Sequence, residues 1–396
     1  MRAKKLSEAR NDAALAIGIL FIATCLRAPF TSLGPLLEIV QESLHLSTAA
    51  TGLVNALPLL AFAILSPVVP LISKKLGLEP ALGVALVLVG AGTALRASGY
   101  IWSLYLGTGF IGCGIAICNV LLPSLVKRDF PGLIPRITAL YALTMGISAA
   151  LGSMLVVPVA QSFGWEFASA TLILLPFVAW LIWIPQMAAW KERTWSECTE
   201  ELQSISLWKS SLAWQVSLFF GITSLIYYIS VSWLPALLKD AGFTDAEAGN
   251  IHGLMQLASA IPGLILLPAI KMMKDQRLIA VIIAAITMLG TTGLAMLPRL
   301  AIIWGACVGF GAGAAIVLGL IFIGLRSSNT RQAASLSGMA QSVGYLLAAS
   351  GPICAGIVHD IFQNWIIVFY SCGFLCILLA LVGLGAGRNI HLNERV

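Results

Sequence analysis

Charged side chains are scarce in this sequence. Asp, Glu, Lys and Arg together make up only 10% of its 396 residues, whereas hydrophobic residues make up 59%. So little charge over this length excludes an ordinary soluble domain. The apolar residues form long continuous runs instead of an alternating pattern, which excludes a transmembrane barrel and favours helices. The sequence therefore predicts an all-α integral membrane protein.

Motifs for hydrolysis, metal binding and nucleotide binding are missing as well. There is no Walker sequence, no Ser/His/Asp set and no metal-ligand spacing. The eight cysteines contain no C-x-x-C pair, so we interpret them as small packing residues. The net charge of +6 follows from basic loops and requires no nucleic-acid partner. We expect a protein that is not an enzyme and that needs no cofactor or metal.

What the sequence does contain is a series of apolar runs, each long enough to cross a bilayer. Twelve runs lie at about 13–39, 49–72, 80–97, 101–125, 134–160, 165–185, 210–238, 245–270, 278–297, 300–325, 332–358 and 364–386. The one clearly polar connection covers residues 187–209. We predict twelve transmembrane helices in two pseudo-symmetric six-helix halves, 1–186 and 210–396, joined by a central cytoplasmic loop at 187–209.

The basic residues indicate the orientation of these spans. Nearly all Lys and Arg residues fall in loops on the same side as the N-terminus, and the opposite loops hold only Arg96, Lys239 and Arg299. Positively charged loops stay in the cytoplasm. The sequence therefore predicts a multi-pass protein of a bacterial inner membrane with both termini cytoplasmic.

The two halves resemble each other. Residues 34–37, near the end of the first run, are similar to residues 234–238 near the end of the seventh. Residues 47–52 align with residues 244–249 at the start of the following run. Parallel six-helix repeats are typical of secondary transporters, whose site lies at mid-membrane between the repeats. These similarities between the two halves favour a transporter over a membrane-embedded enzyme or a receptor.

Arg27 lies close to the middle of the first run. Inserting a guanidinium group at this depth costs at least ~2.5–3.5 kcal/mol on membrane-insertion scales. The Arg27 side chain is therefore expected to face a water-filled cavity and to interact with a partner group. On a continuous helix Thr24, Arg27, Thr31 and Gly34 would form one polar stripe. The alternative is an arginine that only holds neighbouring helices together.

Other large hydrogen-bonding or aromatic side chains within the spans also need partners. The further candidates for substrate binding are Asn119, Tyr141, Tyr227, Tyr228, Trp233, Gln256, Gln341 and Tyr345. His252 is the titratable group expected in the lining, and Glu38 is expected at the outer rim, so both are candidates for proton linkage. The glycines and serines beside them more often mark helix-packing seams.

With these features in view, the chain resembles the major facilitator superfamily, although residues 73–77 lack the aspartate of its loop signature. Similarity to the cyanate/nitroimidazole transporter family is carried by residues 26–27, 34–35, 57–63, 119–131 and 233–235. Similarity to its 2-nitroimidazole exporter branch of enteric bacteria is carried by residues 210–215, 252–254 and 337–345. The resemblance covers essentially the whole chain and implies transport by alternating access.

The cargo is expected to be small and either anionic or rich in acceptor oxygens, because Arg27 supplies a charged, forked donor. A nitroimidazole meets this requirement, since its nitro oxygens accept hydrogen bonds and its flat ring can stack on aromatic side chains. Export of 2-nitroimidazole-like compounds is the predicted function. The alternative is uptake or exchange of cyanate or another small anion. The protein is expected to act as a monomer in membrane lipid.

Overall fold

The computed structural model describes residues 2–130, 133–189, 207–271, 273–328 and 330–392, and these contain helices and no strand. The α-helices are α1 (Arg2–Cys25), α2 (Ala28–Thr31), α3 (Leu37–Leu44), α4 (Thr48–Leu65), α5 (Val69–Leu76), α6 (Leu78–Arg96), α7 (Ile101–Asp129), α8 (Ile134–Phe163), α9 (Trp165–Thr171), α10 (Leu174–Ala189), α11 (Ser211–Asp240), α12 (Asp245–Ala260), α13 (Pro262–Lys271), α14 (Arg277–Met296), α15 (Ala301–Leu325), α16 (Thr330–Phe362) and α17 (Trp365–Ala386). Short 3-10 turns are η1 (Gly34–Leu36), η3 (Leu207–Lys209) and η4 (Pro298–Leu300).

The predicted all-helical membrane fold is confirmed. Eleven segments of the described chain are long and apolar enough to cross a membrane. The remaining predicted run, 245–270, consists of α12 and α13, which are separated at Ile261. Each piece alone is shorter than a membrane crossing, but together they cover the run.

Four of the predicted runs are interrupted, where the sequence predicts continuous helices. The breaks lie at residues 26–27 and 32–36 in the first run, and at 66–68, 172–173 and 261 in the others. A proline lies in or within four residues after each break: Pro29, Pro35, Pro67, Pro176 and Pro262. Because proline has no N–H and its ring clashes with the preceding turn, a helix ends readily beside it. The prediction was therefore right about the extent of these runs, but it did not place the breaks.

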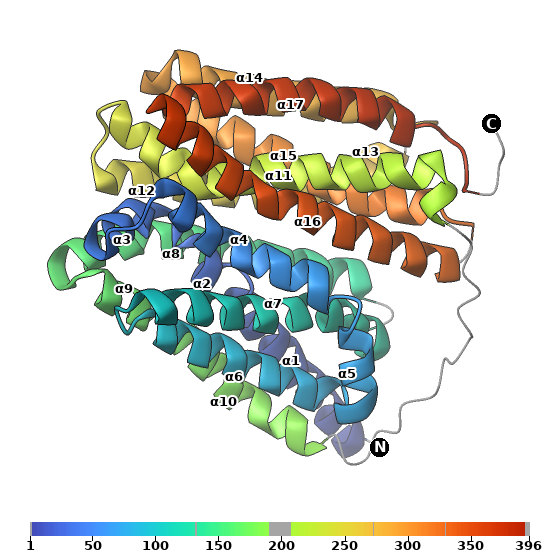
Figure 1. Ribbon diagram of the computed structural model, residues 1–396. Helices are drawn as coiled ribbons and strands as arrows, with labels where there is room; N and C mark the ends of the chain where they lie inside the picture. The colour runs from blue at the N-terminus through green and yellow to red at the C-terminus, as the bar shows by residue number, and fades with distance from the viewer. Residues whose placement is uncertain (1, 131–132, 190–206, 272, 329, 393–396) are drawn as a thin grey trace.

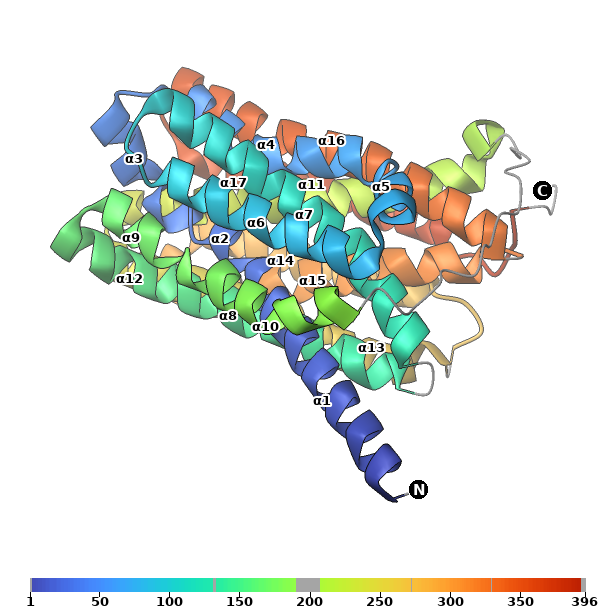
Figure 2. The same ribbon diagram turned by 90° about the horizontal axis from the view of Figure 1, so that it is seen from below.

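The first six spans and the last six form two bundles that lie side by side (Figure 1). They meet where α4 packs against α16 and where α8 packs against α12. Figure 2 shows α1 extending beyond the bundle at the end where both termini lie. We call this the terminal end and the opposite end the α3 end. Because residues 190–206 lie outside the described chain, the domain division at 187–209 stays a prediction.

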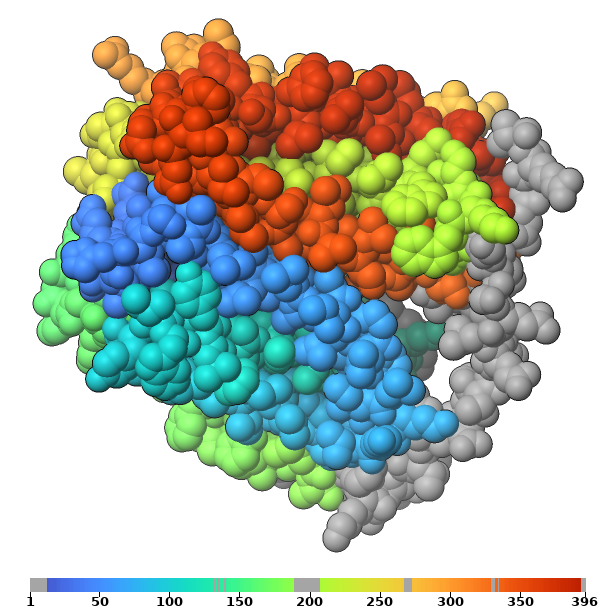
Figure 3. All heavy atoms as spheres, viewed as in Figure 1, coloured from blue at the N-terminus to red at the C-terminus, as the bar shows by residue number. Residues whose placement is uncertain are grey.

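The two bundles are joined more tightly at the α3 end. One hydrophobic core there includes Leu36, Val54 and Val157 of the first bundle together with much of the second. Toward the terminal end the first bundle has a separate core, to which the second bundle contributes the buried residues Ala348 and Ala349 and the partly buried Tyr228, Tyr345 and Ile353. Figure 3 shows the surface closed over the seam at the α3 end and hollowed between α5 and α16 at the terminal end.

Glycines explain the close approach at the α3 end. A Cβ atom added to Gly52 would lie 2.9 Å from the Pro352 carbonyl carbon, and one added to Gly356 would lie 2.7 Å from the Thr48 oxygen. Both contacts cross between the bundles, backbone against backbone. A Cβ added to Gly338, nearer the terminal end of α16, would meet nothing within 4 Å. The α3 end is thus sealed by backbone contacts that only glycine permits.

Candidate functional site

The break in the first span places Arg27 between two helices. Arg27 has φ −125° and ψ −49° and directly precedes α2. Its carbonyl accepts the N–H groups of Phe30 (3.0 Å) and Thr31 (2.8 Å). Since Pro29 has no N–H to continue the ladder of α1, the backbone turns at this point. The Arg27 side chain is half-buried and projects from the backbone at this break.

The polar stripe predicted for a continuous helix is therefore interrupted. The Thr24 hydroxyl donates to the Phe21 oxygen at 2.7 Å. Thr24 also lines a groove of about 410 Å³ beside α8, α9 and α10, together with Ser148 and Leu174. Leu174 is 63% exposed on the outside of the bundle. Thr24 thus lines a groove on the outer surface of the first bundle, whereas Arg27 contacts the second bundle.

Arg27 bonds directly to two helices of the second bundle. Its Nη1 donates to Tyr227 Oη and to Ser259 Oγ, each at 2.9 Å. Its guanidinium carbon lies 5.3 Å from the centre of the Tyr227 ring, within range of a cation–π interaction. Tyr227 is on α11 and Ser259 is on α12. Every recorded partner of Arg27 is neutral.

Gln256 completes this cluster. Tyr227 Oη donates to Gln256 Oε1 at 2.5 Å, and Ser259 Oγ donates to the Gln256 backbone oxygen at 2.7 Å. Tyr227 is 1% exposed and Gln256 is fully buried. The structure therefore brings Arg27, Tyr227 and Gln256 together, as a shared site requires, while their role in binding stays a prediction.

Aromatic rings lie next to the cluster. Tyr228 packs edge-on to Tyr227, with ring centres 5.2 Å apart, and lies 5.5 Å from the Phe30 ring. Tyr345 packs edge-on to Phe62 and Phe220. Tyr228 and Tyr345 are both half-buried, so each keeps part of its ring accessible. A flat cargo could use these ring faces.

Three other predicted residues are half-buried but are not recorded in contact with the cluster. Gln341 Nε2 donates to Ser337 Oγ at 2.9 Å on its own helix, α16. Tyr141 packs against the separate core of the first bundle. Asn119 lies on α7. Their contribution to binding stays a prediction.

Trp233 makes its contacts elsewhere. Its Nε1 donates to the Pro352 oxygen at 3.0 Å, and its ring stacks on Trp365 with the ring centres 4.5 Å apart. The side chain is fully buried. These contacts pack Trp233 between α11, α16 and α17, and its role in stacking on a cargo stays a prediction.

We expect Trp233→Ala to lower stability by about 3–5 kcal/mol, the usual range for truncating a buried aromatic residue. Transport per folded molecule should change little. The half-buried Tyr228 is the matched control: Tyr228→Ala should disturb stability less and weaken cargo binding more. Thermal melting of purified protein and binding titrations measure the two effects. Normal stability with lost binding in Trp233→Ala would return Trp233 to the site.

His252 replaces a backbone donor that Pro235 lacks. In a regular helix residue 235 would donate to the Val231 oxygen, but proline has no N–H. His252 Nε2 lies 3.0 Å from that oxygen. A carbonyl oxygen only accepts, so Nε2 carries the proton in this contact. The fully buried ring thus has a structural role, and proton linkage through His252 stays untested.

Glu38 lies at the α3 end, where it joins the two bundles. Its carboxylate is 2.5 Å from Lys239 Nζ, which also lies 3.1 Å from Asp245. Glu38 and Lys239 line a pocket of about 370 Å³ that includes Glu42 and Asp240. An ion pair in this position adds to the seal made by the glycines.

Comparison with known proteins identifies the family. The model of the Major Facilitator Superfamily matches residues 19–349. The chain belongs to this superfamily. It is 48% identical to the 2-nitroimidazole transporter of Escherichia coli (strain K12) over 96% of this chain and 97% of that protein. It is 25% identical to the cyanate transport protein CynX of the same strain, over 88% of this chain and 90% of that protein.

The fold agrees with this assignment. The crystal structure of a mutant of the nucleoside transporter NupG matches with a TM-score of 0.76 at 14% identity, over 95% of this chain and all of that one. The predicted superfamily, its transporter class and the predicted fold are therefore confirmed.

Arg96 is another arginine that lies inside this facilitator. The distribution of basic residues, which was used to predict the orientation, had assigned Arg96 to an outer loop. Arg96 is 1% exposed in the last turn of α6. Its Nη1 donates to the Pro29 oxygen at 2.6 Å. The Leu33 N–H donates to the Phe30 oxygen, so the Pro29 oxygen is left outside the helical ladder. The proline at the break was the available signal, because a carbonyl released inside a membrane needs a donor.

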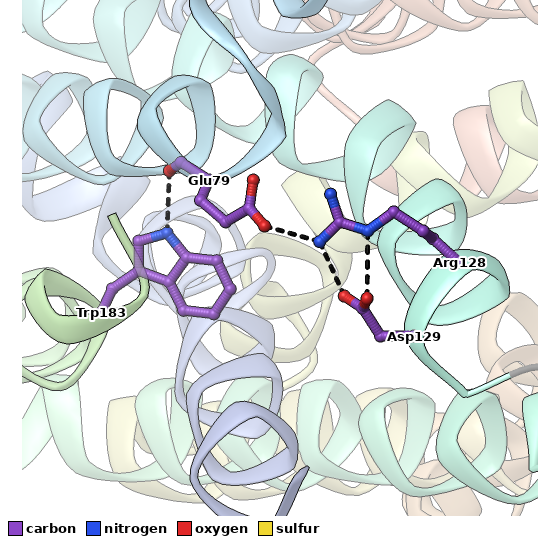
Figure 4. Close-up of polar contacts among 4 residues, drawn as sticks. All are labelled: Glu79, Arg128, Asp129 and Trp183. Atoms are coloured by element: carbon purple, nitrogen blue, oxygen red, sulfur yellow. Dashed lines mark hydrogen bonds and ion pairs between the residues drawn. The ribbon is translucent and has the colours of Figure 1, made fainter. Parts of the chain in front are cut away.

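A further ion-pair cluster of the facilitator fold lies at the terminal end of the first bundle (Figure 4). Glu79 lies 2.5 Å from Arg128, which also pairs with Asp129 at 2.8 Å. Trp183 Nε1 donates to the Glu79 backbone oxygen at 2.9 Å. Glu79 thus provides a buried carboxylate beside residues 73–77, the loop that lacks the aspartate of the superfamily signature. This cluster connects α6, α7 and α10.

Proposed function

We propose that this chain exports a small, flat solute of the 2-nitroimidazole type, which is rich in hydrogen-bond acceptors. The observation that carries the proposal is Arg27, a mid-span cation with neutral partners beside half-buried aromatic rings. The 48% identical relative is a 2-nitroimidazole transporter, which supports the same cargo. The cluster Arg27, Tyr227, Gln256 and Ser259 is the proposed core of the binding site.

Binding at this site is coupled to the position of the two bundles. Arg27 comes from the first bundle, and its hydrogen-bond partners come from the second. A cargo that accepts hydrogen bonds from the guanidinium fork competes with Tyr227 and Ser259. Loading and release therefore change the contacts between the bundles, as alternating access requires.

The orientation follows from the basic loops. With both termini cytoplasmic, the sealed α3 end faces outward and the hollow terminal end faces the cytoplasm. An exporter is loaded from the cytoplasm, and the hollow at the terminal end supports loading from that side. We further propose that the protein acts as a monomer in the bacterial inner membrane and catalyses no covalent step.

Reporter fusions test this orientation. Fusions after Gly77, Asp129 and Leu207 should report the cytoplasm, and a fusion after Gly99 should report the periplasm, because the basic residues lie on the first side. A reporter active only in the cytoplasm and one active only in the periplasm give complementary readouts at each site. A periplasmic signal after Leu207 would contradict the six-plus-six arrangement.

Transport in inverted membrane vesicles tests the cargo and the direction. Vesicles that contain the protein should accumulate labelled 2-nitroimidazole faster than vesicles that contain Arg27→Gln. An imposed proton gradient, present or absent, shows whether protons drive the movement. Uptake of cyanate in preference to 2-nitroimidazole would favour the second candidate, which the similarity to CynX supports.

A further inference from the structure

Two guanidinium groups lie at the same break in the first span. Arg27 occupies the break, and Arg96 donates to the oxygen of Pro29, two residues further on. We propose that the cargo is bound and carried as an anion, so that a 2-nitroimidazole loses its ring N–H proton to water before it binds. This inference rests on the proposed function and specifies the chemical form of its cargo.

The first cation is held by neutral groups alone. Arg27 donates to two hydroxyl groups and lies over one aromatic ring. Neutral partners satisfy hydrogen bonds but leave the formal charge in place. In a medium of low dielectric constant, an unbalanced charge attracts an opposite charge far more strongly than it attracts a dipole.

The second cation is buried still more completely. Arg96 is 1% exposed, its one recorded hydrogen bond goes to the Pro29 oxygen, and its Nε has no partner in the described part of the chain. A carbonyl oxygen does not neutralise a guanidinium group. The positive potential of Arg96 therefore adds to that of Arg27 around the break.

Acidic side chains do not offset these two charges. Glu38 is paired with Lys239 at the α3 end, and Glu79 is paired with Arg128 at the terminal end. Within the ranges that the structure describes, no carboxylate is recorded in an ion pair with Arg27 or Arg96. The negative charge that best balances this region is therefore one that the cargo brings.

A deprotonated nitroimidazole fits the requirement. Loss of the ring N–H proton leaves a flat anion whose charge spreads over the ring nitrogens and the nitro oxygens. Those atoms can accept two parallel hydrogen bonds from a guanidinium fork. On release the anion takes up a proton from water on the other side. Each cycle therefore leaves one proton on the loading side, consumes one on the release side and moves one negative charge across the membrane.

Two isomers provide a matched pair of probes. 4-Methyl-2-nitroimidazole keeps its ring N–H and can ionise, whereas 1-methyl-2-nitroimidazole has the same atoms and cannot. We expect the 4-methyl isomer to bind the purified full-length protein at least tenfold more tightly, about 1.4 kcal/mol. Titration at several pH values adds a second readout. The pH midpoint of binding should shift with the acidity of each ligand across a series of substituted 2-nitroimidazoles.

The outcomes separate this inference from the proposed function. Equal binding of the two isomers, or a pH midpoint that is the same for every ligand, overturns the anion and leaves nitroimidazole transport intact. Failure of both isomers to bind or to be transported overturns both proposals. In Arg27→Gln the affinity ratio of the isomers should fall, because only the charge of Arg96 remains. Partial unfolding does not mimic this readout, because both ligands report on the same folded fraction.

Discussion

Arg27→Gln is expected to reduce transport per folded molecule by about 10- to 100-fold, which corresponds to about 1.5–3 kcal/mol for a hydrogen bond to a charged group. The substitution removes the guanidinium charge and the fork that bonds Tyr227 and Ser259. Glutamine can replace at most one of these bonds and offers no positive charge to the acceptor oxygens of the cargo. The measurement is transport normalised to monodisperse, detergent-extracted protein.

Arg27→Lys is the matched control. It keeps the positive charge but presents a compact ammonium group in place of a planar fork. We expect it to fold and express normally while it loses most transport, with a smaller loss than Arg27→Gln. If Arg27 only holds helices together, both variants should melt early while transport per folded molecule stays normal. Normal specific transport in Arg27→Gln would remove Arg27 from the binding site.

The extent of the spans could be predicted because a bilayer imposes a simple requirement of length and apolarity. The breaks within the spans could not, because a proline can either kink a helix or end it, according to the donors that its neighbours supply. Arg96 illustrates the difficulty: at the end of an apolar run it resembles a loop residue, yet it bonds the Pro29 oxygen from another helix.

Three of the four members of the cluster were among the predicted site residues, whereas Ser259 was interpreted with the serines of helix-packing seams. Large polar residues inside spans need partners, and this reasoning alone selected Arg27, Tyr227 and Gln256. The contacts of Trp233 could not be predicted, because polarity and aromaticity do not specify a helix face. It follows Tyr227 by six residues on α11, which turns it by about 120° to another side of the helix. That side packs against α16 and α17.

The seal at the α3 end could not be predicted from the sequence either, because a glycine in the sequence does not show which backbone segment lies against it. A Cβ atom added to Gly52 would lie 2.9 Å from the Pro352 carbonyl carbon and 3.2 Å from the Ile353 Cα. These are backbone atoms, so no side-chain rotation can relieve the clash. A bulky residue at position 52 must hold α4 and α16 apart at this end.

We therefore expect Gly52→Leu to reduce transport at least tenfold, about 1.4 kcal/mol, while cargo still binds. The protein should be trapped with its α3 end open, so Gln41→Cys, placed in the pocket at that end, should react faster with a membrane-impermeant maleimide in this variant. Gly338→Leu is the matched control, because an added Cβ there meets nothing within 4 Å. It should keep both transport and slow labelling. Normal transport by Gly52→Leu would show that the glycine seal does not form during the cycle.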